Sequence, residues 1–308
     1  MKTNPPKENQ EERLVRILKK VRRIELLTRG VVKETLGGAY QSRFKGQGIE
    51  FDDFREYQPG DDVRFLDWNV TARMNHPFVR KYIEERELTV ALLVDVSASA
   101  DYGSGEDNRR ERAAQLAAVF AFSAVQNQDK VSLLLGAQSL EHYLPARKGG
   151  SHALRCLRDI LFCEPTSRGT RLECMMDVAL KRIVHRGLVV LISDFLQPCS
   201  QWEHALSLLA ARHDVVAVQL CDPLERELPA LGRVNLLDPE TGMQVLVDTN
   251  HPGTRAAYQS SMQEHQAAIE GIFKRRSVEH LNLPLDGDEA PLLRAFFRKR
   301  RQRGGRVA

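Results

Sequence analysis

Long apolar runs are scarce in this sequence of 308 residues. The longest lie at residues 88–96 and 188–196, and both are shorter than the roughly 20 residues that a membrane-spanning helix needs. The first residues, MKTNPPKENQEERL, contain no uninterrupted hydrophobic stretch followed by small residues, so they do not look like a secretory signal. We therefore expect a cytoplasmic protein without a transmembrane segment, and we interpret both runs as buried strands.

Cysteine is rare, and no pair of histidines stands near a cysteine at the spacing of zinc ligands. We expect the five cysteines to be reduced structural thiols. A nucleotide-binding loop is missing as well. Gly103 and Gly105 follow an apolar run, but there is no third glycine at dinucleotide spacing and no phosphate-loop lysine. These absences weigh against a disulfide framework, a zinc site and a nucleotide site.

Positive charge exceeds negative charge only slightly, with a net charge of +4. Apolar residues make up 42% of the sequence and charged residues 28%, which suits a compact globular protein. The basic excess lies at the ends. Residues 11–29 form an amphipathic basic helix pattern, which either packs on the protein or meets an anionic membrane or acidic partner. The basic residues at 298–306 are either a solvated tail or a nucleic-acid contact. We expect no specific nucleic-acid binding.

The rest of the chain alternates between strand and helix patterns. Residues 37–81 predict a small β-rich module, followed by the rhythm of a βαβ protein. Expected strands lie at 88–94, 131–135, 140–144, 188–192, 215–220 and 278–283, and expected helices at 109–126, 151–162, 171–184, 201–212, 255–274 and 290–298. A hairpin is expected near 236–247. The fold class is therefore α/β, a doubly wound and mostly parallel sheet with the β-rich module and a helix before it.

These patterns predict three segments. Residues 1–86 contain the N-terminal helix and the β-rich module, residues 87–290 form the doubly wound domain, and residues 291–308 contain the end of the last helix and the basic tail.

Oxygen-bearing side chains follow two of the predicted strands. Asp95, Ser97 and Ser99 come directly after the first strand of the sheet, and Asp194 follows the strand at 188–192. Ligands in doubly wound sheets bind outside the carboxyl ends of the strands, so neighbouring strands would bring the two carboxylates together. Thr170, in a loop between them, offers another hydroxyl. An all-oxygen set favours Mg²⁺, or Mn²⁺, as the bound ion.

Each of these residues also has a plain structural interpretation. Thr170 and Glu173 form a capping-box pattern at the start of a helix. Ser97 and Ser99 can be turn residues, although Asp107 is the better cap for the helix that follows. Asp194 can simply end a strand, although the helix after it has its own capping-box pattern at 200–203.

Two motifs in this sequence resemble known families. Asp95, Ser97 and Ser99, then Thr170 and Asp194, resemble the metal-ion-dependent adhesion motif (MIDAS) of von Willebrand factor A domains. The segment FDDFREYQPGDDVR at 51–64, with DW at 67–68 and TAR at 71–73, resembles the bacterial DUF58 family. The resemblance covers roughly residues 37–286 and implies a partner of MoxR-type AAA+ ATPases. Ala100 departs from the pattern, because many relatives have a larger apolar residue there.

The sequence thus predicts a protein that is not an enzyme but a metal-dependent adaptor or assembly factor, whose cation captures an acidic residue of a protein partner. One alternative is a Mg²⁺-dependent phosphohydrolase with Asp95 as nucleophile. Such enzymes commonly have a second carboxylate two positions later, where this chain has Ser97. A third is a nucleic-acid or membrane-surface protein that acts through its basic ends.

Overall fold

A computed structural model of the protein describes residues 50–59, 61–83, 88–103, 107–287 and 290–304. These residues belong to two compact units, which divide between residues 88 and 89. The predicted N-terminal helix at 11–29 lies outside the described residues. Among the described residues, no helix has the length and apolarity to cross a membrane.

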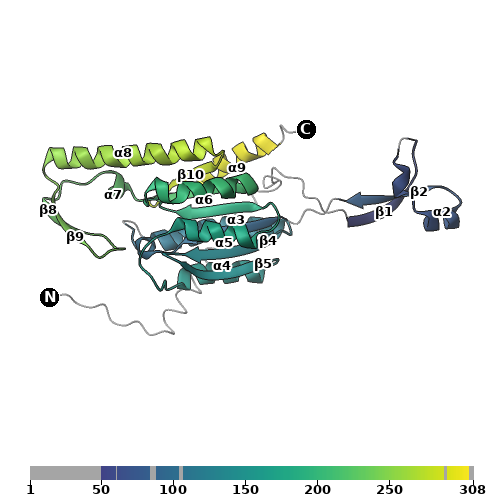
Figure 1. Cartoon of the computed structure of the whole chain (residues 1–308), viewed down its shortest axis with the longest axis horizontal. Helices are drawn as coiled ribbons and strands as arrows, with labels where there is room; N and C mark the ends of the chain where they lie inside the picture. Colours follow the sequence, from purple (N-terminus) through teal and green to yellow (C-terminus); the bar gives the residue numbers. More distant parts are fainter. Residues whose placement is uncertain (1–49, 60, 84–87, 104–106, 288–289, 305–308) are drawn as a thin grey trace. The chain divides into compact units, whose positions relative to one another are not determined.

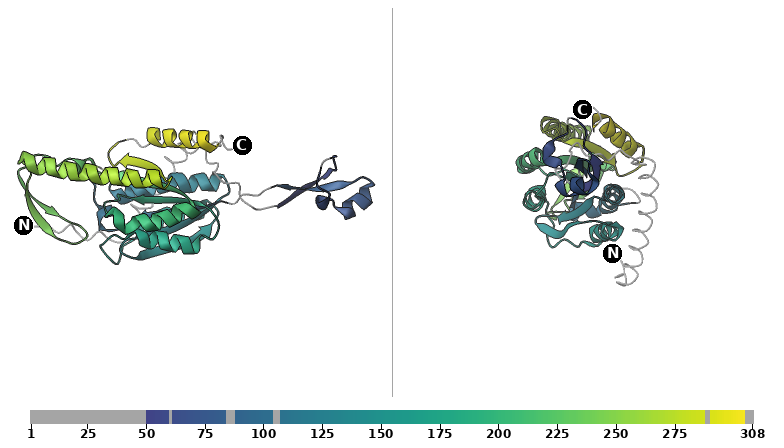
Figure 2. Two further views of the ribbon diagram at one scale, coloured as in Figure 1. Left: turned by 45° about the horizontal axis from the view of Figure 1, so that its top comes forward. Right: turned by 90° about the vertical axis from the view of Figure 1, so that its right-hand side faces the viewer.

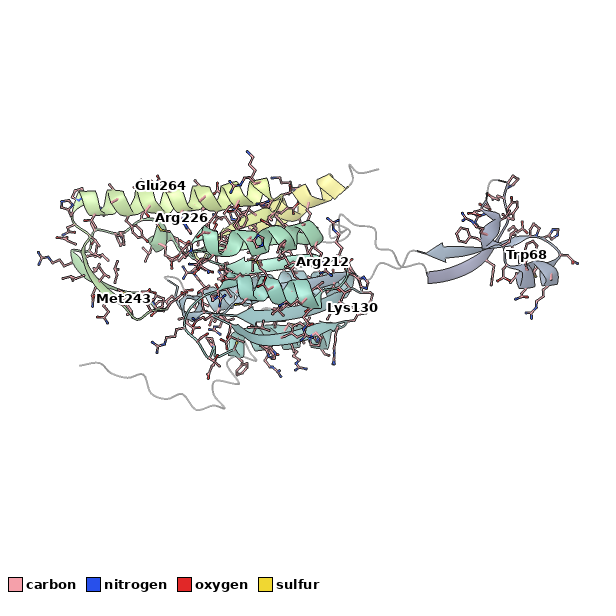
Figure 3. All side chains as sticks on the ribbon, viewed as in Figure 1. Trp68, Lys130, Arg212, Arg226, Met243 and Glu264 are labelled. Atoms are coloured by element: carbon pink, nitrogen blue, oxygen red, sulfur yellow. The ribbon has the colours of Figure 1, made fainter. Side chains whose placement is uncertain are left out.

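The smaller unit contains an antiparallel strand pair and two short helical segments. Its elements are β1 (Glu50–Glu56), η1 (Val63–Phe65), α2 (Trp68–Met74) and β2 (Phe78–Ile83). The prediction of a β-rich module is correct for β1 and β2, which pair with each other, but it missed α2. The side chain of Asp67 starts α2 by accepting hydrogen bonds from two backbone amides of its first turn. Trp68 at its start is 72% exposed (Figure 3).

Four charged residues of the 51–64 segment form two ion pairs. Arg55 and Asp61 form a two-armed ion pair with N–O distances of 2.7 Å, and Arg64 pairs with Asp62. In such pairs the guanidinium fits both oxygens of a carboxylate. These residues hold the turn between β1 and α2.

The larger unit is built on a six-stranded sheet. Its strands are β3 (Thr89–Asp95), β4 (Lys130–Gly136), β5 (Leu140–Arg147), β6 (Leu188–Ser193), β7 (Asp214–Cys221) and β10 (Glu279–Pro284). The order across the sheet is β10-β7-β6-β3-β4-β5, and all neighbours are parallel except β4 and β5. The predicted doubly wound, mostly parallel sheet is therefore confirmed.

Helices cover both faces of this sheet (Figures 1 and 2). The long helices are α3 (Arg109–Gln126), α4 (Gly150–Phe162), α5 (Leu172–Arg182), α6 (Cys199–Arg212), α8 (Pro252–Arg275) and α9 (Ala290–Gly304). On one face α3 packs against α4 and α9, where Phe120 contacts Phe297. On the other face lie α5, α6 and α8. The short α7 (Pro223–Arg226) follows β7, and β8 (Arg233–Leu237) and β9 (Gln244–Asp248) form a separate hairpin.

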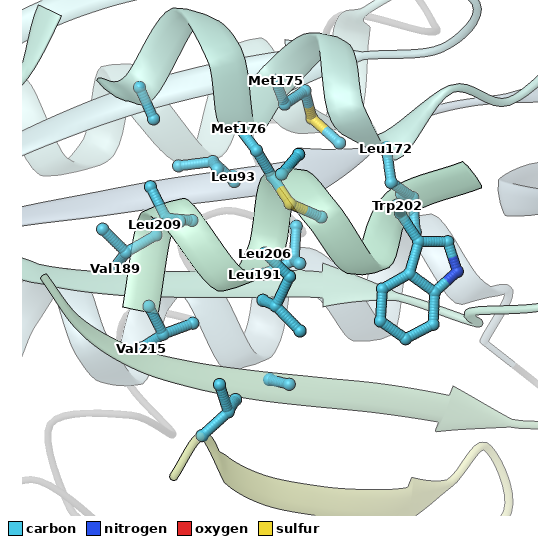
Figure 4. Packing of buried hydrophobic residues seen from close by; sticks show 14 of the residues in the cluster. Leu93, Leu172, Met175, Met176, Val189, Leu191, Trp202, Leu206, Leu209 and Val215 are labelled. Atoms are coloured by element: carbon cyan, nitrogen blue, oxygen red, sulfur yellow. The ribbon is translucent and has the colours of Figure 1, made fainter. Parts of the chain in front are cut away.

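A continuous apolar core fixes the central strands. Every residue of β6 is buried, as is every residue of β3 after Thr89. Leu93, Leu191 and Trp202 pack with the methionines of α5 between the sheet and its covering helices (Figure 4). Strands buried on both faces need such continuous apolar runs, which explains why residues 88–96 and 188–196 are the longest runs in the sequence.

The C-terminal helix differs from the prediction of a helix ending near residue 298. It continues to Gly304, and Arg300 is not part of a solvated tail. Its side chain is 8% exposed and pairs with Asp214 and with Glu279, the latter at 2.7 Å. Because a buried guanidinium needs a carboxylate partner, these two acids at the start of neighbouring strands dock α9 onto the sheet.

Candidate cation site

The carboxyl ends of β3 and β6 form the edge where the predicted site residues meet. The two strands are parallel neighbours, with Val94 opposite Ile192. Asp95 ends β3, and Asp194 directly follows β6, so both carboxylates lie at the same edge. The chain passes from β3 to β4 on one side and from β6 to β7 on the other. The edge between β3 and β6 is therefore the switch point at which doubly wound sheets bind ligands.

Hydroxyl groups surround the Asp95 carboxylate. One of its oxygens accepts a hydrogen bond from the backbone N–H of Ser97 at 2.9 Å, and the other accepts one from the Ser193 hydroxyl at 2.8 Å. The hydroxyls of Ser97 and Ser99 are 3.1 Å apart. Asp95, these three serines and Asp194 are all buried. Burial of this many polar groups has a desolvation cost, so the arrangement needs a structural or functional explanation.

The negative charge of Asp194 disfavours ionisation of Asp95. Burial, together with the negative charge of Asp194, raises the pKa of Asp95 to about 6, although the hydrogen bonds from Ser97 and Ser193 act in the opposite direction. Two like charges in a buried site are relieved by a positive charge placed between them. The electrostatics of this edge therefore suit a cation.

One positive charge is already present, and the sequence interpretation missed it. Arg109, in the first turn of α3, places its Nη1 3.7 Å from an oxygen of Asp194 and donates a hydrogen bond from the same atom to the backbone carbonyl of Ser99 at 3.2 Å. Its guanidinium also pairs with Glu225 of α7. When ionised, Asp95, Asp194 and Glu225 carry three negative charges, and Arg109 carries one positive charge. These four residues together therefore have a formal charge of −2. Arg109 neutralises the site only in part.

A small cavity of about 10 Å³ lies among these residues. Asp95, Ser99, Arg109, Ser193 and Asp194 contribute its polar lining. This volume is about that of one water molecule by the same measure. The site therefore has room for a single small occupant among its oxygens.

Thr170 lies in a loop beside this cluster but has another partner. The backbone N–H of Ala98 bonds to the carbonyl of Arg168 at 3.3 Å, which joins the two loops. The Thr170 hydroxyl donates a hydrogen bond to the carboxylate of Glu240. Helix α5 begins at Leu172 without a side-chain cap bond from the residue before it. The capping-box interpretation of Thr170 is therefore wrong.

The other predicted caps differ as well. Asn108, and not Asp107, caps α3 by accepting a hydrogen bond from the Glu111 amide. Helix α6 begins at Cys199 after Pro198 and has no side-chain cap. Ser97 and Ser99 do lie in a turn, because the Ala100 amide bonds to the Ser97 carbonyl at 3.0 Å and the Tyr102 amide bonds to the Ser99 carbonyl at 3.2 Å. The turn uses their backbone atoms. The hydroxyl of Ser97 forms no cap and contacts the hydroxyl of Ser99.

The structure thus brings Asp95, Ser97, Ser99 and Asp194 together and places Thr170 on the adjoining loop. The donor atoms are carboxylate and hydroxyl oxygens, which is the chemistry that hard divalent cations prefer. Within the described ranges, no group of three or more His, Cys, Asp or Glu side chains is arranged to hold a metal ion. Any cation here would have to be held largely by neutral hydroxyls.

Comparisons with known proteins identify relatives over most of the chain. A family model described as "Protein of unknown function DUF58" matches residues 53–268. Uncharacterized proteins of Mycobacterium tuberculosis (strain ATCC 25618 / H37Rv) and of Mycobacterium bovis are each 34% identical over 284 residues, which is 92% of this chain and 89% of theirs.

Solved structures that resemble the chain share little sequence with it. The conserved hypothetical protein BatB from Bacteroides thetaiotaomicron is 15% identical, with a TM-score of 0.47, over 70% of this chain and 99% of that one. A von Willebrand factor type A protein from Catenulispora acidiphila is 10% identical, with a TM-score of 0.40, over 74% of this chain and 44% of that one.

Proposed function

This chain belongs to the DUF58 family, and we propose that it is a non-enzymatic adaptor or assembly factor whose von Willebrand factor A-like domain binds a protein partner through Mg²⁺ or Mn²⁺. Asp95, Ser97, Ser99, Thr170 and Asp194 would hold the ion. The partner would supply an acidic residue. The family resemblance points to a MoxR-type AAA+ ATPase as that partner.

The observation that carries this proposal is the pairing of two buried carboxylates with three buried hydroxyls at the switch point of the sheet. Hydroxyls are neutral ligands, so a divalent ion among them keeps part of its positive charge, and Mg²⁺ usually retains exchangeable waters. A bound ion would therefore supply an attraction for a carboxylate from outside. Recognition of an acid in this way requires no bond to be broken.

The phosphohydrolase alternative has no comparable support. A general acid or base would be needed two residues after Asp95, where the Ser97 hydroxyl instead contacts Ser99.

Cation binding should make the stability of the protein depend on pH in a defined direction. The folded-state pKa of Asp95 is about 6 against an ordinary value of 3.8. Without a cation, ionisation of Asp95 therefore lowers the free energy of unfolding of the protein as pH rises from about 4 to above 6. A cation favours the ionised form and reverses that loss. We expect Mn²⁺ to raise the unfolding midpoint by several degrees at about pH 7.5 and by less than half as much at about pH 5.

Thermal unfolding at both pH values, with MnCl₂ or with a chelator, measures the shift of the unfolding midpoint that Mn²⁺ causes. Equal midpoints with and without Mn²⁺ at the higher pH would contradict the cation site.

Partner capture tests the adaptor role. Immobilised full-length protein should retain a MoxR-type ATPase from the same organism in Mg²⁺ and release it in chelator, because the partner's carboxylate binds only to the ion. A phosphatase screen with Mg²⁺ on the same preparation should give no turnover above the buffer control. Mg²⁺-dependent turnover that disappears in Asp95→Asn would favour the enzyme alternative.

A further inference from the structure

The β8–β9 hairpin carries an acidic residue to the edge of the cation site. Its turn connects Leu237 to Gln244, and Glu240 within that turn accepts the hydrogen bond of the Thr170 hydroxyl. In Figures 1 and 2 the closed end of the hairpin points toward this edge of the sheet. Glu240 thus places a carboxylate against Thr170, a predicted metal ligand that lies 70 residues earlier in the chain.

The turn is braced in a way that presents Glu240 outward. The side chain of Asp238 accepts hydrogen bonds from the Glu240 amide at 2.9 Å and from the Thr241 hydroxyl at 2.6 Å. The amide of Gly242 bonds to the Asp238 carbonyl at 2.8 Å, with Gly242 at a φ of +74°. Glycine adopts this left-handed conformation without steric cost. The turn therefore fixes the backbone of Glu240 while its own side chain bonds outside the hairpin.

Glu240 is half-buried, and its carboxylate contacts the hydroxyl of Thr170. Thr170 is one of the five residues proposed to hold the ion. A carboxylate on that hydroxyl therefore has the position of an acid that approaches the ion from outside the Asp95 and Asp194 cluster.

The hairpin buries little apolar surface. Its two strands pair with each other, and their side chains remain largely in solvent: Leu236, Leu237, Met243, Val245 and Leu246 are exposed. Met243 is visible near the turn in Figure 3. A segment that buries so little apolar surface can separate from the domain at small cost. The Glu240 contact can therefore break and re-form without unfolding the sheet.

We propose that Glu240 is an intramolecular ligand of the cation site, which takes from within the chain the place that the acidic residue of the partner takes in the complex. This inference rests on the proposed function. Displacement of the hairpin would open a coordination position on the ion. The apolar side chains of the hairpin would then lie beside the site. The acidic residue of the partner would then lie in a turn of the partner and would compete with Glu240 for the ion.

The hairpin itself supplies the probe for an experiment. Full-length wild type and Glu240→Gln are titrated with Mn²⁺ by calorimetry, and then with a fluorescent peptide of residues 230–250 in Mn²⁺. Loss of a carboxylate at the ion should weaken Mn²⁺ binding by about tenfold. The peptide should bind Glu240→Gln at least about tenfold more tightly than wild type, because the tethered acid competes at millimolar effective concentration. A peptide that carries Glu240→Gln should not bind.

Asp248→Asn is the matched control, since it removes one acid from the exposed base of the same hairpin and should behave like wild type in both titrations. Equal Mn²⁺ affinities, or equal peptide affinities, for wild type and Glu240→Gln would overturn the inference while leaving the cation site intact. Absence of Mn²⁺ binding by wild type would overturn the proposed function, and this inference with it.

Discussion

Replacement of Asp95 by asparagine should abolish divalent-cation binding, with a loss of affinity of at least about 100-fold. Asparagine preserves the shape and keeps an oxygen to accept the Ser97 amide, and its amide group can donate to the Ser193 hydroxyl. What disappears is the negative charge. Because burial and Asp194 already oppose that charge, the metal-free variant should be at least as stable as wild type at about pH 7.5.

Calorimetric titration with Mn²⁺ and thermal unfolding in chelator measure the two effects on the same preparations. Asp101→Asn is a suitable control, because Asp101 stands six residues away, pairs with Arg110 and is 59% exposed. Its charge is largely screened at the surface, so Mn²⁺ affinity should change by less than about twofold. An Asp95→Asn protein that still binds Mn²⁺ like wild type would end the case for this site.

The sheet domain could be predicted from sequence because its signals are strong and local. Continuous apolar runs identified β3 and β6, and helical periodicity predicted a helix at 109–126, where α3 is found. The smaller unit was harder. Helix α2 has seven residues, no buried side chain and no apolar stripe, so its start depends on the cap at Asp67 more than on periodicity.

The site was predictable only where chain order determines position. A residue directly after a buried parallel strand lies at the carboxyl edge, so Asp95 and Asp194 could both be placed at that edge, and their meeting depended on whether β3 and β6 are neighbours, as they are. Glu225 and Glu240 come from a short helix and a hairpin after β7, and no periodicity specifies how such segments fold back. Only tertiary contacts reveal them.

Arg109 did leave a signal that was overlooked. It stands with Arg110 in the first turn of α3, where the positive end of the helix dipole disfavours a cation. Two arginines at that end indicate acidic partners elsewhere in the fold. Asp194 and Glu225 are those partners of Arg109, and Asp101 is the partner of Arg110.

Replacement of Arg109 by methionine should destabilise the metal-free protein strongly and make its stability depend on the cation. Methionine can fill the space of the aliphatic stem, but Asp194 and Glu225 lose their cation in a site where Asp194 is 7% exposed. Removing one member of a buried ion pair costs about 3–5 kcal/mol, and the partial exposure of Glu225 places the expectation at the lower end. The unfolding midpoint should fall on the order of 10 °C.

The same substitution makes the site more negative, so Mn²⁺ should bind Arg109→Met more tightly than wild type and recover part of the lost stability. Unfolding midpoints across a Mn²⁺ titration measure both effects. Arg109→Lys separates charge from geometry: lysine keeps the positive charge but lacks the planar fork that reaches Ser99, Asp194 and Glu225 together, so it should lie between wild type and Arg109→Met without Mn²⁺. If Mn²⁺ stabilised Arg109→Met less than wild type, Arg109 would be a support of the cation site and not a substitute for its charge.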